Sequence, residues 1–144
     1  MVLLIPASIP ELRANWQFFV TGVGEVIDKC NADFHPADVY RELTTGGVHL
    51  YWVEVPEGDC VGFTVLSDYT DRYSQKRVLN MDMTYLIPLS DVLLELRDAV
   101  DALASELEYD RIEWFSPRLG WDRQMEKIGF RSDSKLFVRE VQHG

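Results

Sequence analysis

The sequence predicts a mixed α/β domain in which antiparallel strands come first and alternating strands and helices follow. Three strand candidates succeed one another between residues 49 and 87, separated by short polar segments. From residue 90 onward, helical and strand patterns alternate. The 144 residues, 47% of them apolar, are enough to bury one core without disulfides or metals. We therefore expect a single domain over residues 1–144, with a mixed sheet and helices on both of its faces.

The N-terminal segment predicts a short strand and a long helix. Residues 2–5 form an apolar run that a proline ends, which suits a strand. Ser8 and Glu11 have the S-x-x-E spacing of a capping box, so a helix is expected to begin there. Gly22 and Gly24 lie within this helix and are two candidates for an early end or a kink. One apolar stripe nevertheless continues along the helix, formed by Leu12, Trp16, Phe19, Val23 and Ile27.

The remaining elements follow from periodicity and from turn residues. Pro36 suits the first turn of a second helix, and Pro88 closes a strand because proline cannot continue a central ladder. Asp91 is expected to cap the longest helix. In chain order, the predicted elements are a helix at 36–43, strands at 49–55 and 60–66, a polar loop at 68–75, a strand at 77–87, a helix at 90–107, a strand at 111–116, a helix at 121–128 and a last strand at 135–141.

Composition argues against several classes of function. No segment approaches the ~20 apolar residues of a membrane span, and the first residues lack a basic leader, so a cytoplasmic protein is expected. A net charge of -10 disfavours direct binding to nucleic acid. Cys30 and Cys60 are far apart, and neither they nor the three histidines show the spacing of metal ligands. We expect no metal site and two unpaired thiols.

The charge is divided unevenly along the chain. Residues 1–110 carry 7 basic and 19 acidic side chains, a balance of -12, whereas residues 111–144 carry 7 basic and 5 acidic side chains, a balance of +2. The basic C-terminal segment is either ordinary solvated surface or a binding site for an anionic ligand or an acidic partner.

Three short motifs resemble those of a known superfamily. Residues 126–130, E-K-I-G-F, resemble the E-K-x-G-F that ends the last helix of GNAT (Gcn5-related N-acetyltransferase) proteins. Gly62-Phe63 resembles the family's v-G-f, and residues 85–88, Y-L-I-P, resemble its l-y-V-x-P strand ending. The resemblance covers nearly the whole chain. It implies a GNAT-like fold, mostly antiparallel in the N-terminal half and β-α-β-α-β in the C-terminal half.

A narrower resemblance points to one source of such proteins. Residues 47–52, G-V-H-L-Y-W, and residues 118–123, R-L-G-W-D-R, are similar to segments of small GNAT-like proteins encoded by tailed bacteriophages. This resemblance implies a protein of the host cytoplasm or of the virion.

Two departures from the family pattern bear on activity. The family holds acetyl-CoA with a loop of the form R/Q-x-x-G-x-G/A, whereas residues 88–94 here are P-L-S-D-V-L-L, without glycine or a basic residue. Asp91 at the helix start would repel a phosphate. Met125 stands where the family commonly has a proton-donating tyrosine, and a thioether cannot donate a proton. The expected cofactor is therefore none, with acetyl-CoA as the alternative.

If the chain is active, the resemblance places its general base on the central strands. Asp82 and, as second choice, Glu113 are the candidate general bases, unless both face outward as ordinary polar strand residues. Tyr85 and Tyr109 are the nearest substitutes for the proton donor, unless they are core or rim aromatics. The catalytic candidates are thus Asp82, Glu113 and Tyr85, and the candidate cofactor-binding residues are Tyr85, Leu86, Ile87, Ser90, Arg118 and Arg123.

Three functions remain open at this point. The favoured hypothesis is a GNAT-like protein that has lost catalysis and binds a protein partner, with phage structural proteins among the candidates. The alternative is an active acetyl-CoA-dependent N-acetyltransferase, so whether the chain is an enzyme is left open. The third is an acidic decoy that occupies a DNA-binding host protein, suggested only by the charge of -12 on residues 1–110. The sequence does not indicate an oligomeric state.

Overall fold

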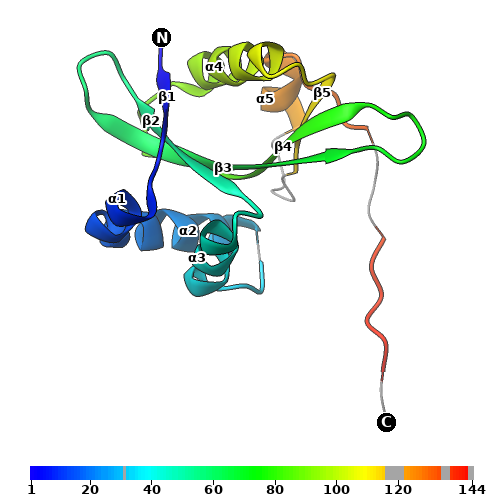
Figure 1. The fold of residues 1–144 in the computed structure, drawn as a ribbon, viewed down its shortest axis with the longest axis horizontal. Helices are drawn as coiled ribbons and strands as arrows, with labels where there is room; N and C mark the ends of the chain where they lie inside the picture. The colour runs from blue at the N-terminus through cyan, green and yellow to red at the C-terminus, as the bar shows by residue number, and fades with distance from the viewer. Residues whose placement is uncertain (31, 116–121, 134–136, 143–144) are drawn as a thin grey trace.

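A computed structural model describes residues 1–30, 32–115, 122–133 and 137–142 (Figure 1). Within them, five strands form one mixed sheet in the order β1-β2-β3-β4-β5, antiparallel except for the parallel pair β4 and β5. Helices α1 to α3 cover one face, and α4 and α5 cover the other. The predicted mixed α/β class is confirmed. The elements are β1 Leu3–Pro6, α1 Ile9–Ala14, α2 Trp16–Cys30, α3 Pro36–Thr45, β2 His49–Glu54, β3 Cys60–Thr70, β4 Arg77–Leu86, α4 Leu93–Glu106, β5 Arg111–Trp114 and α5 Asp122–Lys127.

The predicted first helix is two helices, divided at Asn15. The capping box is present, because Ser8 Oγ accepts from the Glu11 backbone N–H at 3.2 Å while Glu11 accepts from the Ser8 N–H. Asn15 then ends α1, and its side-chain amide donates to the Glu11 carbonyl at 2.9 Å. An asparagine that binds a nearby backbone group competes with the helical pattern. The expected break at the glycines is wrong, since Gly22 and Gly24 both lie inside α2.

The face covered by α1 to α3 has an aromatic core centred on Phe63 of β3. Its ring is fully buried and lies 5.3 Å from the ring of Phe19 and 5.7 Å from that of Tyr85, between centroids. Trp52 meets it edge-on at 6.4 Å. The buried residues of this core are Leu12, Phe19, Val23, Val39, Leu50, Trp52, Phe63, Val65 and Met83.

The two glycines of α2 differ in what surrounds them, which gives a matched test of this packing. A Cβ added at Gly22 would lie 2.4 Å from Phe63 Cε2 and 2.7 Å from Tyr85 Cδ2, whereas one added at Gly24 meets nothing within 4 Å. We expect Gly22→Ala to lower the free energy of unfolding by about 1–3 kcal/mol through overpacking. Gly24→Ala should leave it unchanged or raise it by up to ~1 kcal/mol, because alanine favours a helix. Urea denaturation measures both, and equal effects would contradict the packing described here.

The opposite face is covered mainly by α4, which begins three residues later than predicted. Asp91 does not cap it: the N-cap is Val92, and no side chain accepts from the first turn. Instead Leu89 and Asp91 both have positive φ, at 67° and 51°, so residues 89–91 turn sharply before the helix. The core beneath α4 consists of Val2, Val53, Leu66, Leu79, Met81, Val92, Leu96, Val100 and Ala104.

Two strand predictions are corrected by the structure. The segment 68–70, predicted as loop, continues β3 and pairs with the start of β4, where Thr70 lies opposite Arg77. The predicted last strand at 135–141 is wrong for its described residues 137–141, none of which is in a strand. There, Phe137 is 89% exposed, and the segment leads away from the sheet and its helices (Figure 1). Residues 116, 121 and 135–136 of the predicted elements lie outside the described residues.

No helix of the described residues has the length and apolarity that crossing a bilayer requires. Cys30 and Cys60 are unpaired and partly buried. Among the described residues, no three His, Cys, Asp or Glu side chains are grouped so that they could hold a metal ion.

Candidate functional site

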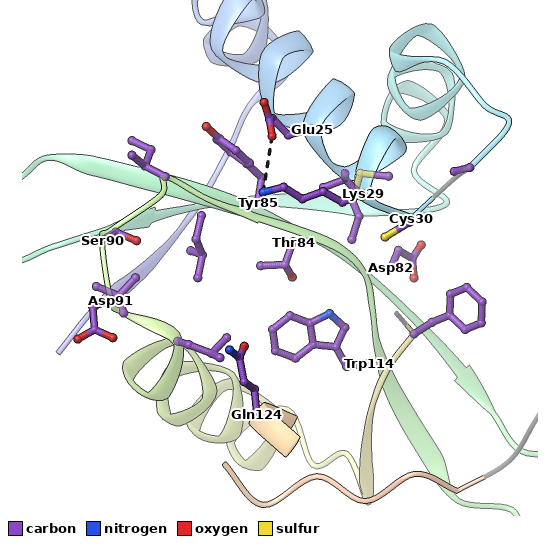
Figure 2. Close-up of a pocket in the computed structure, with 18 of the residues that line it drawn as sticks. Glu25, Lys29, Cys30, Asp82, Thr84, Tyr85, Ser90, Asp91, Trp114 and Gln124 are labelled. Carbon is purple, nitrogen blue, oxygen red and sulfur yellow. Dashed lines mark ion pairs between the residues drawn. The ribbon is translucent and has the colours of Figure 1, made fainter. Parts of the chain in front are cut away.

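The two parallel strands β4 and β5 separate partway along the sheet, and a cavity opens where they part. Their pairing ends at Met81 and Trp114, but β4 continues to Leu86. The part of β4 from residue 82 to residue 86 therefore has a described strand on one side only. A cavity of about 310 Å³ lies beside this segment, bounded also by the C-terminal half of α2 and the start of α4 (Figure 2).

The cavity is apolar over most of its wall. Val26 of α2, Leu86 of β4 and Val92 before α4 contribute aliphatic side chains. The indole of Trp114 projects from β5 into the space between β4 and α5 (Figure 2), and its ring meets Phe130 edge-on at 5.9 Å. Such a slot suits an extended, uncharged chain better than a charged group.

Asp82 is the predicted general base that lines this cavity. It is partly buried and lines the cavity near Cys30 (Figure 2). Its Oδ1 accepts hydrogen bonds from the Ser67 hydroxyl and from the Asn80 side-chain amide. These two donors fix the carboxylate in place. Its role as a general base stays a prediction.

The predicted cofactor-binding residues on β4 and after it also meet here. Tyr85, Leu86, Ile87 and Ser90 all line the cavity. The Tyr85 ring packs edge-on against Phe18 at 5.9 Å, which holds it against the aromatic core. The roles predicted for these four residues have not been tested.

The other predicted site residues lie elsewhere. Glu113 lines a separate groove of about 850 Å³, where it accepts from the Tyr69 hydroxyl and lies 3.5 Å from Arg111. That hydrogen bond raises the pKa of Tyr69. Arg123 is exposed and lines neither the cavity nor this groove, and Arg118 lies outside the described residues. Tyr109 is also distant from the cavity, and its hydroxyl donates to Asp68 at 2.7 Å.

Sequence reasoning missed three polar residues that helices contribute to the cavity. Glu25 and Lys29 face it from α2 and form an ion pair at 3.6 Å, drawn as the dashed line in Figure 2. Their i, i+4 spacing on a helix was the available signal. Gln124 of α5 points toward the cavity from the opposite side. It directly precedes Met125, which instead lines the groove beside Glu113.

The turn before α4 and the charges of the cavity lining bear on what could bind there. The first turn of α4 has no side-chain cap, and the left-handed residues Leu89 and Asp91 give the backbone a turn of the kind that can collect N–H groups around an anion. The charged side chains of the described lining, however, are the acids Glu25, Asp82 and Asp91 and the single base Lys29. The apolar slot suits the uncharged arm of a coenzyme A-type thioester, whereas three acids against one base in the described lining disfavour its diphosphate.

Comparison with known proteins adds information on the fold. No protein-family model matches the chain, and no curated protein matches its sequence significantly. Among solved structures, a probable acetyltransferase aligns with 98% of this chain and 99% of its own at 19% identity, with a TM-score of 0.71. A ribosomal-protein-alanine N-acetyltransferase from Brucella melitensis biovar Abortus 2308 aligns over 97% and 99% at 17% identity, with the same TM-score. An aminoglycoside 6'-N-acetyltransferase from Acinetobacter baumannii aligns over 100% of both chains at 10% identity, with a TM-score of 0.69.

These likenesses extend along almost the full length of each structure, and the sequence identities are low. They therefore establish the fold. Any activity has to be argued from the residues of the site. The chain has the GNAT-like acetyltransferase fold.

Proposed function

We propose that this chain is an acetyltransferase-fold protein that does not transfer acetyl groups and acts by binding another protein. The observation that carries the proposal is the acidic charge of the described cavity lining. Coenzyme A carries several negative phosphate charges. In the described lining, the carboxylate of Asp91 lies beside the start of α4, where it would repel them. Lys29 already lies beside Glu25. A carboxylate and a phosphate ~6 Å apart repel by roughly 1–3 kcal/mol, which offsets the attraction of an open helix N-terminus.

The position of Met125 supports the same proposal. An acetyl transfer leaves a thiolate that needs a proton. The thioether of Met125 cannot supply one, and it lines the groove beside Glu113 rather than the cavity. Gln124, which does face the cavity, has a neutral amide that is no acid at physiological pH.

The source and partner of the protein form part of the proposal. The resemblance of residues 47–52 and 118–123 to GNAT-like proteins of tailed bacteriophages supports a virion-associated or other protein-binding component of such a phage. It would act in the host cytoplasm or in the particle, and phage structural proteins are the candidate partners.

A second candidate function, acetyl-CoA-dependent N-acetyltransferase, is favoured by a different observation. The edge of β4 from residue 82 to residue 86 has no partner among the described strands and runs beside an apolar slot. The turn at Leu89 and Asp91 has a backbone shape that suits an anion. In that case Asp82 would accept the proton of the amine, and Tyr85 is the hydroxyl among the catalytic candidates that lines the cavity.

Acetyl-CoA binding separates the two candidates. If the chain does not bind acetyl-CoA, 1 mM of it should shift the melting temperature of the native chain by less than about 1 °C. Binding with a dissociation constant near 10 µM would instead stabilise the folded state by ~2.7 kcal/mol and raise the melting temperature by roughly 5–10 °C. Asp91→Asn removes the charge while keeping the size of a side chain that tolerates positive φ. It should tighten binding about 5–150-fold, the equivalent of the roughly 1–3 kcal/mol of repulsion removed, as measured by isothermal titration calorimetry.

The control is Asp59→Asn, the same charge change at an exposed turn residue that does not line the cavity. It should not alter acetyl-CoA binding. A native chain that is stabilised by several degrees and releases free thiol in the presence of an amine would establish the second candidate instead.

A further inference from the structure

The hairpin of β3 and β4 extends past the ends of the other strands, and residues 71–76 form its tip (Figure 1). The two strands stay paired up to Thr70 and Arg77, directly before the tip. Arg77 also ties the hairpin to the body, because its guanidinium donates to the carbonyl oxygens of Leu107 and Glu108 just after α4. The hairpin tip is therefore presented on a firmly attached arm.

The hairpin tip is held in one shape by its own hydrogen bonds. Asp71 Oδ1 accepts from the backbone N–H groups of Tyr73 and Ser74 at 3.0 and 2.9 Å. The Gln75 side-chain amide donates to the Arg72 carbonyl oxygen at 2.7 Å. A loop that is ordered before it binds loses less conformational entropy on binding. The tip is thus prepared for contact with another molecule.

The side chains of the hairpin tip have the character of a protein-binding surface. Tyr73 is 89% exposed, and Arg72 and Lys76 are exposed as well. Neither cation forms an ion pair with a described residue. Tyrosine and arginine are enriched among the residues that dominate the binding energy of protein interfaces. An aromatic ring with two neighbouring cations suits a partner surface that is apolar at its centre and acidic around it.

The cavity beside the end of β4 has this complementary chemistry. Its volume of about 310 Å³ lies at the small end of the ~300–1,000 Å³ of ligand pockets, so one large side chain would fill much of it. Its wall is mostly apolar, which suits an aromatic ring. Asp82 Oδ1 already accepts two hydrogen bonds, whereas Oδ2 accepts none from a described residue and is available to a phenolic hydroxyl. Glu25 and Asp91 are exposed members of the lining and are available to cations.

The hairpin tip cannot reach the cavity of its own chain, since the tip precedes β4 and the cavity lies beside residues 82–86 at the other end of that strand. We propose that the tip of one copy of this chain docks in the cavity of a second copy, with Tyr73 in the apolar slot and Arg72 and Lys76 against the acidic lining. The contact joins two different surfaces and is therefore heterologous. The inference rests on the proposed function, because the docked ring occupies the space that the arm of coenzyme A would need.

Sedimentation equilibrium tests the docking at about 500 µM chain and ~0.15 M salt, which screens the repulsion between two acidic bodies beyond ~8 Å. We expect a mean mass above the 16.6 kDa of one chain. The contact is small, so its dissociation constant should be about 10–100 µM. At a few micromolar, single chains prevail, and unfolding measurements report on the monomer.

Arg72→Glu combined with Tyr73→Ala should weaken this association at least about 30-fold. Both side chains are exposed, so the fold should be retained, as circular dichroism will show. Arg123→Glu is the control, because it makes the same charge change at an exposed residue that does not line the cavity. It should associate like the native chain.

Mixing two defective variants gives a second readout. Glu25→Lys combined with Asp91→Asn changes the described lining from three acids and one base to one acid and two bases, and should prevent self-association. The hairpin-tip variant keeps an intact cavity, and this cavity variant keeps an intact tip. An equimolar mixture of the two should therefore form a one-to-one complex, although neither associates alone.

The docking is overturned by a native chain that stays monomeric at about 500 µM, by a hairpin-tip variant that associates like the native chain, or by a mixture that forms no complex. Binding of acetyl-CoA to the native chain at a few micromolar would instead contradict the proposed function. The two failures are thus told apart.

Discussion

Gly62→Ala is expected to lower the free energy of unfolding by more than about 3 kcal/mol. Gly62 lies in β3 opposite Leu86 of β4. A Cβ at this position would lie 2.0 Å from the carbonyl oxygen of Tyr85 and 3.0 Å from the Leu86 Cα. Both are backbone atoms of a paired strand and cannot rotate away, so the ladder itself must open. Overpacking typically costs about 1–3 kcal/mol where flexible side chains can move aside. The cost is larger here because backbone atoms of a paired strand cannot move aside.

Urea denaturation monitored by circular dichroism measures this loss. Gly24→Ala is the control, since a Cβ there meets nothing within 4 Å. Because Tyr85 and Leu86 also line the cavity between β4 and β5, the Gly62 variant should disturb the candidate site as well as the sheet. A variant as stable as the native chain would show that β3 and β4 are not in the register described.

Phe63→Ala is expected to cost about 3–5 kcal/mol, a large part of the ~5–15 kcal/mol that stabilises an ordinary domain. The Phe63 ring is fully buried, and its removal leaves a void between α2 and the sheet. The surrounding rings of Phe18, Phe19 and Tyr85 are themselves tightly packed around it, which limits how far the void can collapse.

The same denaturation experiment applies to Phe63→Ala. Tyr73→Ala provides the comparison, since that aromatic side chain is 89% exposed and its loss should change stability by no more than ~0.5 kcal/mol. A loss at Phe63 as small as that at Tyr73 would mean that the aromatic core is packed differently.

Much of the fold was predictable because its signals are local. The capping box at Ser8, the proline that closes β4 and the alternation after residue 90 each specify backbone geometry over a few residues. The division at Asn15 was not foreseen, because the apolar stripe continues across it without interruption. The signal for the break is the Asn15 side chain, which donates a hydrogen bond to the backbone of the preceding turn. Gly22 was expected to disturb α2, but its lack of a side chain is what allows Phe63 and Tyr85 to approach the helix.

The site was predictable only where one strand supplies it. Asp82, Tyr85 and Leu86 follow from the position of β4 before its closing proline. Glu113 was a reasonable second acid, but it lies opposite Asn80 in the ladder and lines the groove beside it, and this register is not specified by the sequence of β5. Glu25 and Gln124 reach the cavity from α2 and α5, and no spacing in the sequence relates elements so far apart along the chain.

Trp114 borders both the cavity and the groove that Glu113 lines, so one indole stands between two spaces. A smaller side chain at this position would bring the two spaces into contact, and a different orientation of the ring would enlarge one at the expense of the other. The volume available beside β4 therefore depends on a residue of the neighbouring strand.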